Sequence, residues 1–295
     1  MPFRDILQTH LIRTRGAIKG LTLITWTIAA ACSSIDVPPG SSYAYLDSKG
    51  PPPGYLAKGE HPDSLALLPP PPAPESVAFA LDEQLNRQTL ELRDTPRWQL
   101  AAQDAMTRFP DAAGTFSCAL GVPINQQDTP SAYLILRRSA VDVGMSVRRV
   151  KKHYQRERPF IVNEQPVCTP TAIRYLKKDG SYPSGHTAAG WVWALIFAEI
   201  APDKADAVLA RGWEFGQSRA VCNVHWQSDV TQGRVIGATL VARLHANDEF
   251  RADLANAREE IAAVRARGLP PDRDCAAEAK ALAKNLPADQ RVGSN

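Results

Sequence analysis

The stretch 187–200 (TAAGWVWALIFAEI) constrains the fold most, because apolar residues occupy almost every position. A surface helix carries one apolar stripe, whereas a helix that is apolar all round must be enclosed by other elements. We therefore expect a central buried helix here. Strand patterns are scarce from Ser76 onward, and the sequence predicts one compact all-α domain over residues 76–268. Its expected helices cover residues 76–107, 130–157, 186–201, 203–220, 226–246 and 248–267.

Prolines set a different kind of segment apart from this domain. Eleven of the 24 prolines fall between residues 33 and 76, where neither a regular helix nor a central strand can form. We expect residues 32–75 to be extended and partly polyproline, with the part around Leu67 and Leu68 packed on the domain. The Gly268-Leu269-Pro270 break predicts that residues 269–295 form a C-terminal tail.

The first 31 residues have the pattern of a secretory signal peptide. Basic residues precede an apolar run from Gly20 to Ala31, and Cys32 follows three alanines. Twelve apolar or small residues are too few to span a bilayer, which takes roughly 20. We therefore expect export to the periplasm or the exterior. Two alternatives stay open at the cleavage site: ordinary cleavage, or a lipoprotein-type site that leaves a lipid anchor on Cys32.

The number of cysteines is relevant to export, because disulfides form in an oxidising compartment. Beyond Cys32 the chain has four cysteines, and an even number in an exported protein predicts two disulfides. The sequence contains no Cys-x-x-Cys pair and none of the close Cys/His spacings of a zinc site, so it favours no metal site. Three pairings are open among Cys118, Cys168, Cys222 and Cys275.

The net charge excludes one class of partner. The whole chain carries a formal charge of +3, and residues 1–31 hold four cations against one carboxylate, so the remainder is neutral. A protein that binds a nucleic-acid polymer needs positive charge clustered on its folded part. We therefore do not expect a nucleic-acid partner.

Three short clusters carry residues suited to chemistry on an anion. In the first, KKHYQRERPF, Lys151 and Arg158 stand seven residues apart, which places them two turns along one helical face before Pro159 ends the helix. Both cations can then point at one anion. The other charged residues of the run fit an ordinary solvated surface: Lys152, Arg156 and Glu157.

The second cluster, PSGHT at residues 183–187, directly precedes the apolar helix. Glycine lets the backbone approach a ligand closely, and the free N–H groups of a helix N-terminus attract anions. We expect Ser184 and Gly185 to form this turn, with His186 at the mouth of the site. The alternative is a capped helix start with a structural histidine.

The third cluster contains Ser218-Arg219, His225 and Asp229. Because His225 and Asp229 are four residues apart, they share a face if the segment is helical. A carboxylate bound to one imidazole nitrogen fixes the tautomer and leaves the other nitrogen free to attack. The same spacing also occurs in ordinary surface pairs.

Together the clusters supply three cations, a helix N-terminus, two histidines and a carboxylate, a set suited to phosphoryl transfer without a metal. In order, K-x6-RP, PSGH and SR-x5-H-x3-D resemble the signature of the type-2 phosphatidic-acid phosphatase superfamily, which includes the vanadium haloperoxidases. Within it, GSYPSGHTAAGW, GQSRAVCNVHWQSDV and the early LLPPPP resemble the bacterial class A non-specific acid phosphatases. The resemblance extends from about residue 63 to residue 267.

This resemblance implies an acid phosphatase that hydrolyses a broad range of small phosphomonoesters through a phosphohistidine on His225. It implies that Asp229 holds the ring of His225, and that His186 protonates the leaving alkoxide and then activates water. It also implies no cofactor, inhibition by vanadate and phosphate, and a homo-oligomer. The phosphate oxygens would be bound by the remaining signature residues: Lys151, Arg158, Ser184, Gly185 and Arg219.

The roles of the two histidines predict a bell-shaped, acidic pH profile, because His186 must begin protonated while the attacking nitrogen of His225 must be free. A vanadate-dependent haloperoxidase and a non-catalytic phosphate-binding protein are the rival functions. A membrane lipid phosphatase is disfavoured, since no segment after residue 31 approaches the roughly 20 apolar residues required. Four further histidines are not expected to be catalytic: His10, His61, His153 and His245.

Overall fold

The computed structural model describes residues 50–283, and every structural statement below refers to that part of the chain. Helices joined by loops make up this part, and no β-strand occurs in it. The α-helices are α1 (Ser64–Leu67), α2 (Val77–Leu90), α3 (Pro96–Asp104), α4 (Ser117–Leu120), α5 (Pro130–Tyr154), α6 (Pro159–Val162), α7 (Ile173–Leu176), α8 (Gly185–Ile200), α9 (Ala205–Val221), α10 (Gln227–Leu244), α11 (Asp248–Ala266) and α12 (Cys275–Leu282). Short 3-10 helices are η2 (Ala113–Phe116), η3 (Pro170–Ala172) and η4 (Pro202–Lys204).

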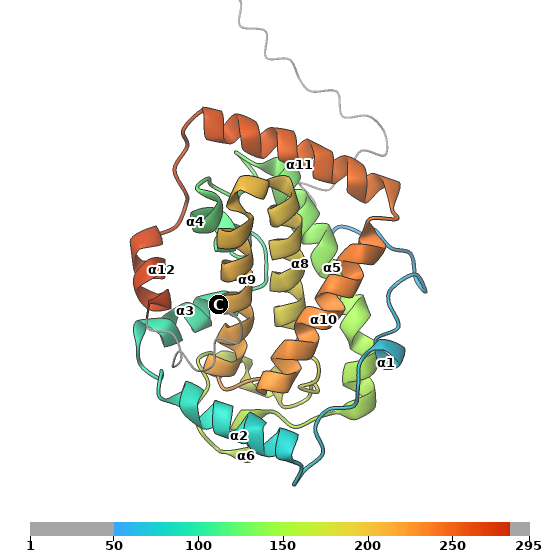
Figure 1. Cartoon of the computed structure of the whole chain (residues 1–295), viewed down its shortest axis with the longest axis vertical. Coiled ribbons are helices and arrows are strands. Elements are labelled where there is room, and N and C mark those ends of the chain that lie inside the picture. Colours follow the sequence, from blue (N-terminus) through green and yellow to red (C-terminus); the bar gives the residue numbers. More distant parts are fainter. Residues whose placement is uncertain (1–49, 284–295) are drawn as a thin grey trace, which may run out of the picture. The chain divides into compact units, whose positions relative to one another are not determined.

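The all-α prediction is confirmed, and helix α8 lies at the centre of the bundle. Figure 1 shows α8 running between α9 and α10, and it also packs against α5 and α11. Val192, Trp193 and Phe197 are fully buried. Burial of each such side chain contributes roughly 1.5–3 kcal/mol, which explains why the most apolar segment takes the central position.

The first expected helix, residues 76–107, is divided in two. Helix α2 ends at Leu90 and α3 begins at Pro96, so the prediction of one continuous helix is wrong. Proline lacks an N–H donor, and its ring disfavours helical backbone in the residue before it. The connection also contains Asp94 in the left-handed region, with a φ of 61°.

The proline-rich segment after residue 50 packs on the helices. Tyr55, Leu56 and Leu68 are buried in the main core. The carboxylate of Asp142 on α5 accepts hydrogen bonds from the backbone N–H groups of Tyr55 and Leu56, at 2.8 and 3.2 Å. Gly54 permits this close approach, because a Cβ there would lie 2.3 Å from Oδ1 of Asp142. This segment therefore belongs to the same core as the helices.

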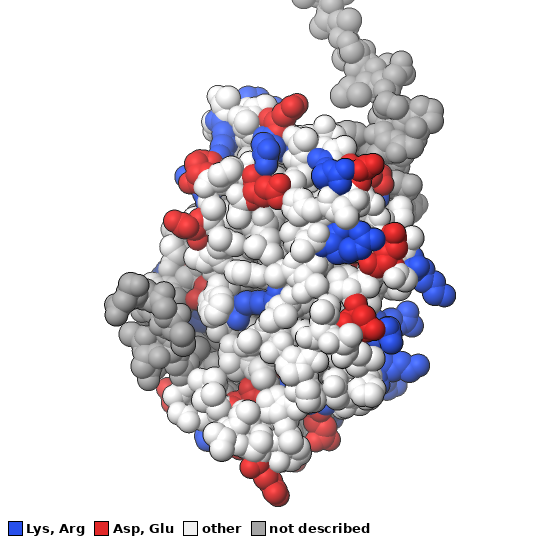
Figure 2. Space-filling model, turned by 45° about the vertical axis from the view of Figure 1, so that its right-hand side comes forward, with Lys and Arg blue, Asp and Glu red and all other residues white. Residues whose placement is uncertain are grey.

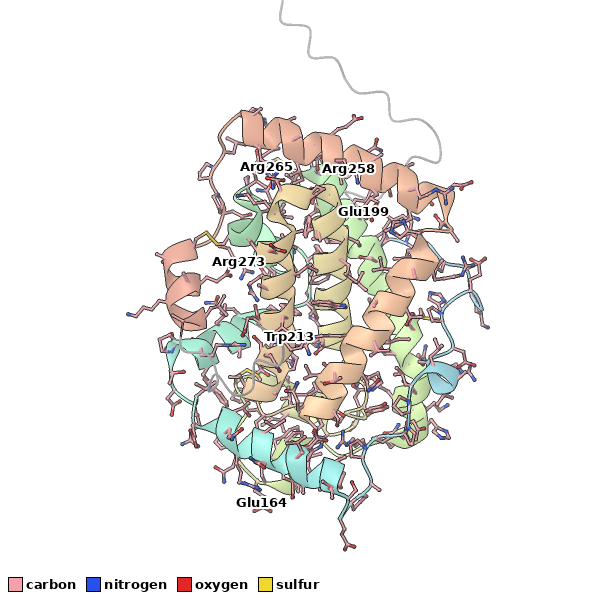
Figure 3. The ribbon with its side chains drawn as sticks, in the orientation of Figure 1. Glu164, Glu199, Trp213, Arg258, Arg265 and Arg273 are labelled. Atoms are coloured by element: carbon pink, nitrogen blue, oxygen red, sulfur yellow. A yellow bond between two sulfur atoms is a disulfide. The ribbon has the colours of Figure 1, made fainter. Side chains whose placement is uncertain are left out.

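Two disulfides join distant parts of the chain and appear as yellow bonds in Figure 3. Cys118 pairs with Cys275, and Cys168 pairs with Cys222, which selects one of the three pairings left open by the sequence. The first disulfide fastens α12 beside α4, within the region that the sequence analysis sets apart as a tail. The second ties the loop before α7 to the end of α9.

Helix α11 covers the ends of α8 and α9 (Figure 3). Arg258 donates to the carbonyl oxygen of Glu199 at 3.0 Å, and Arg265 pairs with Asp203 at 2.8 Å. On the face shown in Figure 2, basic and acidic side chains are interspersed and mostly uncharged residues cover the middle. None of the helices described is long and apolar enough to cross a bilayer.

Candidate active site

The three sequence clusters meet at one cavity of about 460 Å³. Its lining includes residues from each cluster, with Lys151 and Arg158 from the first, Gly185 and His186 from the second, and His225 from the third. The structure also buries the other predicted site residues: Ser184, Arg219 and Asp229. Larger hollows along α12 contain none of the predicted residues.

Lys151 and Arg158 converge, although not along one helical face. Helix α5 ends at Tyr154, Gln155 adopts a left-handed conformation with a φ of 43°, and Arg158 is extended before Pro159. The shared-face prediction is therefore wrong, because the residue before a proline avoids helical backbone. The two cations meet instead at Asp179, whose Oδ2 lies 3.1 Å from Nζ of Lys151 and 3.0 Å from Nη2 of Arg158.

The hydrogen bonds of His225 define which of its nitrogens is free. Nη1 of Arg158 lies 3.0 Å from Nε2 of His225, and a guanidinium can only donate, so Nε2 accepts and carries a lone pair. Nδ1 therefore carries the proton. This nitrogen faces Oγ of Ser181 at 3.3 Å and Oδ2 of Asp229 at 3.5 Å.

His225 and Asp229 lie together for a reason other than the one the sequence suggests. His225 precedes α10, so the two side chains do not share a helical face. Asp229 is the third residue of α10, and its Oδ2 accepts from the backbone N–H of Trp226 at 2.8 Å and from Oγ of Ser181. This bond from the N–H of the N-cap residue to the third helical residue turns the carboxylate back toward the helix start, where His225 lies.

Arg156 is a site residue that the sequence analysis places on the solvated surface, and that prediction is wrong. Its side chain is only 8% exposed, and Nη1 donates to Oδ1 of Asp229 at 2.6 Å. Nη2 donates to Oδ2 of Asp82 at 2.8 Å, and Asp82 also accepts the backbone N–H of Ser228 at 2.8 Å. Asp82, on α2, is thus a second residue that the sequence analysis misses.

The end of α5 explains the burial of Arg156. In an extended backbone, alternate side chains point the same way. Arg156 and Arg158 therefore both turn inward, whereas Gln155 and Glu157 are exposed. The alternation of arginines before Pro159 is the signal that identifies Arg156 as a buried residue. It can be recognised only if the expected helix 130–157 is ended at residue 154.

The turn at residues 183–187 is a capped helix start that also presents free donors. Oγ of Ser184 accepts from the N–H of Thr187 at 3.2 Å, and the N–H of Ser184 donates to the carbonyl oxygen of Asp229 at 3.0 Å. Gly233 lets α10 approach this turn, since a Cβ there would lie 2.6 Å from the carbonyl oxygen of Ser184. The first N–H groups of α8, at Gly185 and His186, lack intrahelical acceptors and suit an anion.

His186 has a defined tautomer in this setting. Its Nε2 lies 3.2 Å from the carbonyl oxygen of Ala105, which can only accept, so Nε2 carries the proton and Nδ1 is the nitrogen that can titrate. Burial lowers the pKa of His186 well below its usual value, and the charge of Arg219 lowers it further. Burial and the charge of Arg158 likewise lower the pKa of His225. Both rings are thus neutral near pH 7 when no anion is bound.

Arg219 gives the strongest sign of an anion site. Its side chain is 2% exposed, and neither Nε nor Nη1 has a hydrogen-bond partner within residues 50–283. Burial and the charge of Arg158 lower the pKa of Arg219 to about 9, and the same causes lower the pKa of Lys151 to about 8. A buried donor without a partner costs roughly 1–3 kcal/mol, so a bound anion would stabilise the site.

The remaining candidates lie elsewhere. His61 contacts Asp142 at 3.1 Å, and His245 contacts Glu199 at 3.1 Å. Neither lines the cavity. Within the described ranges, no group of three or more His, Cys, Asp or Glu side chains is arranged to hold a metal ion.

Known proteins share sequence with the part of the chain that contains these motifs. Residues 132–251 match the PAP2 superfamily. The chain is 43% identical over 209 residues to the non-specific acid phosphatase of Providencia stuartii, which covers 70% of this chain and 84% of that protein. The non-specific acid phosphatase of Salmonella typhimurium is 40% identical over 200 residues, covering 68% of this chain and 80% of that protein. The acid phosphatase of Zymomonas mobilis is 39% identical over 212 residues, covering 72% and 80%.

The chain belongs to the PAP2 superfamily. The resemblance inferred from the motifs is thereby confirmed, and this PAP2 protein falls among the acid phosphatases. The superfamily match begins after α2, so Asp82, which contacts Arg156 and Ser228, lies outside it.

Proposed function

We propose that this PAP2 phosphatase hydrolyses a broad range of small phosphomonoesters through a phosphohistidine on His225, without a metal ion. The observation that supports this most is the orientation of the His225 ring. Nε2 lies 3.0 Å from Nη1 of Arg158, and Nδ1 faces Asp229, so the nitrogen with the lone pair is the one at the cation cluster.

In the first step Nε2 of His225 attacks phosphorus in line and the P–O bond to the leaving alcohol breaks. Lys151, Arg158 and Arg219 bind the equatorial oxygens, helped by Ser184 and the N–H of Gly185. Phosphoryl transfer has a loose transition state, which mainly requires positioning and charge stabilisation. Three fixed cations supply both, and this is the basis for proposing that no metal is needed.

His186 handles the protons in both steps. A bound phosphate dianion raises its pKa, which the cations otherwise depress, so Nδ1 becomes protonated and can give its proton to the leaving alkoxide. Nδ1 then accepts a proton from the water that attacks the phosphohistidine, which releases phosphate and restores His225. Asp229 stabilises the cationic ring of the intermediate through Nδ1.

Labelling with a ³²P phosphomonoester tests the proposal. We expect rapid, acid-labile labelling of the wild type that resists EDTA, is blocked by vanadate, and is lost in His225→Ala. His153→Ala, which changes an exposed histidine outside the cavity, is the control and should label normally. A protein that binds phosphate but turns over no phosphomonoester would instead be a phosphate-binding protein, and loss of activity in EDTA would contradict metal independence.

We also propose export to the periplasm or the exterior, on the basis of residues 1–31 and Cys32, which lie outside the described residues. Cell fractionation checks this, and palmitate labelling that Cys32→Ala abolishes would identify the lipoprotein alternative. Finding the protein in the cytoplasm would contradict it. The expected homo-oligomer is tested by sedimentation of the purified protein.

A further inference from the structure

Two cations beyond the signature line the same cavity. Arg148 and Lys152 lie on α5 beside Lys151, and both side chains are exposed, whereas Lys151 is half-buried. They are four residues apart and therefore neighbours on the helix surface. Tyr175, which is 68% exposed, also lines the cavity. These three residues are exposed side chains at the solvent side of the cavity that His186 and His225 also line.

Arg148 and Lys152 differ from the neighbouring Arg149 in having no anionic partner within residues 50–283. The adjacent Arg149 forms an ion pair with Asp63 at 3.1 Å and does not line the cavity. Within residues 50–283, the side chains of Arg148 and Lys152 have neither a hydrogen bond nor an ion pair. The positive charge at the mouth is therefore uncompensated.

The charges deeper in the cavity do not compensate it either. Asp179 is the one carboxylate among the described lining residues, and it contacts Lys151 and Arg158. A phosphate dianion together with Asp179 would carry three negative charges, which match Lys151, Arg158 and Arg219. No anionic charge of the site or of a simple phosphate group is then left for Arg148 and Lys152.

We infer that the site prefers phosphomonoesters whose leaving alcohol carries a second anionic group, a carboxylate or a second phosphate, bound by Arg148 and Lys152. The inference rests on the proposed function, because it assigns the second anion to the leaving group. Arg148 lies three residues before Lys151, a rise of about 4.5 Å along the helix, and Lys152 is next to Lys151. Both Arg148 and Lys152 have long, flexible side chains. This reach suits an anion placed one short carbon chain away from the phosphate.

Matched substrate pairs test this inference. 3-Phosphoglycerate and glycerol 3-phosphate share a three-carbon skeleton and differ in a carboxylate against a hydroxymethyl group. Glucose 1,6-bisphosphate and glucose 6-phosphate test a second phosphate in the same way. We expect the wild type to show the higher kcat/KM for the doubly anionic member, and the difference between the pairs identifies which anion is preferred.

The variants are Arg148→Gln and Lys152→Gln, with Arg149→Gln as the matched control. Each test variant should lower kcat/KM for the doubly anionic substrate by about two- to fivefold, as expected for partly exposed ion pairs, and the effect should shrink in high salt. Glycerol 3-phosphate and glucose 6-phosphate should be unaffected. Arg149→Gln should change none of the four substrates.

Two results would overturn the inference while leaving the proposed function intact. One is an equal loss on both members of each pair, which would mean general attraction of phosphate. The other is no loss on any substrate. If the wild type turned over none of the four esters yet bound phosphate, the proposed function itself would fail.

Discussion

The two sides of the His225 ring use the same residue types with opposite balances of charge. On the cavity side, Lys151, Arg158 and Arg219 are accompanied by one carboxylate contact, Asp179. On the far side, Arg156 alone lies between two carboxylates, Asp82 and Asp229. On the far side the cation is paired with both carboxylates. On the cavity side, within residues 50–283, positive charge is in excess and two donors of Arg219 have no partner.

Arginines on the two sides are therefore expected to contribute differently to the stability of the fold. Removing one partner of a buried ion pair leaves the other charge buried and uncompensated. The resulting loss of folding free energy exceeds the net contribution of the intact pair. A buried cation whose donors lack a partner lowers the free energy of unfolding, a cost that binding sites commonly carry. Arg156 and Arg219 should therefore respond to the same substitution with opposite changes in stability.

Arg156→Met should change the stability of the protein the most. The change leaves Asp82 and Asp229 without their shared cation and should lower the free energy of unfolding by about 3–5 kcal/mol, measured by urea denaturation at pH 7. Arg243→Met is the control, because Arg243 forms an exposed pair with Glu60 at 3.3 Å and should cost at most about 1 kcal/mol. Equal losses in the two variants would contradict the comparison.

A bound anion should stabilise the protein by a somewhat smaller amount. Inorganic phosphate at 100 times its Kd should raise the free energy of unfolding by about 2.7 kcal/mol, seen as a higher Tm. Arg243→Met should keep this response and Arg219→Met should lose it. A response to phosphate that survives in Arg219→Met would place the anion elsewhere.

A smaller effect is expected for Arg219→Met in the absence of phosphate. Removing a buried guanidinium with unpaired donors should raise the free energy of unfolding by roughly 1–3 kcal/mol. Activity should fall in the same variant. Thermal denaturation of the free protein measures the first and an assay with a chromogenic phosphomonoester the second. Destabilisation without loss of phosphate binding would show that Arg219 has a structural role instead.

A modest shift is expected in the pH profile of activity. His186 donates a proton only when charged, so the alkaline limb of kcat follows its pKa in the bound state. After burial, Arg219 is the main cause that lowers the pKa of His186, so Arg219→Gln should raise that pKa and move the limb of the residual activity to higher pH. A limb that stays in place, or moves to lower pH, would refute the role given to His186.

Local patterns in the sequence predicted the cavity side well. Lys151, Arg158, His186 and His225 line one cavity as expected, because short motifs at helix ends determine local backbone geometry. The shared helical faces expected at Arg158 and His225 do not form, because Arg158 follows the end of α5 at Tyr154 and His225 precedes the start of α10 at Gln227.

The contacts on the far side of the His225 ring cannot be predicted from local sequence patterns. Asp82 contacts Ser228, which is 146 residues away in the sequence, and nothing near Asp82 indicates that partner. The all-round apolar character of α8, by contrast, was enough to place that helix at the centre. Composition along a helix thus predicts burial, whereas a contact between distant polar residues depends on how the helices pack.

Asp229 is the residue at which the three signature motifs meet. Its carboxylate contacts Ser181, Trp226 and Arg156, and its carbonyl oxygen accepts the N–H of Ser184. The three motifs are therefore aligned on one residue rather than by the lengths of the loops between them. Insertions in a connection such as 201–204, at the far end of α8, should therefore leave activity largely unchanged. Lengthening a loop adds little to the entropic cost of closing it, and the contacts of Asp229 stay the same.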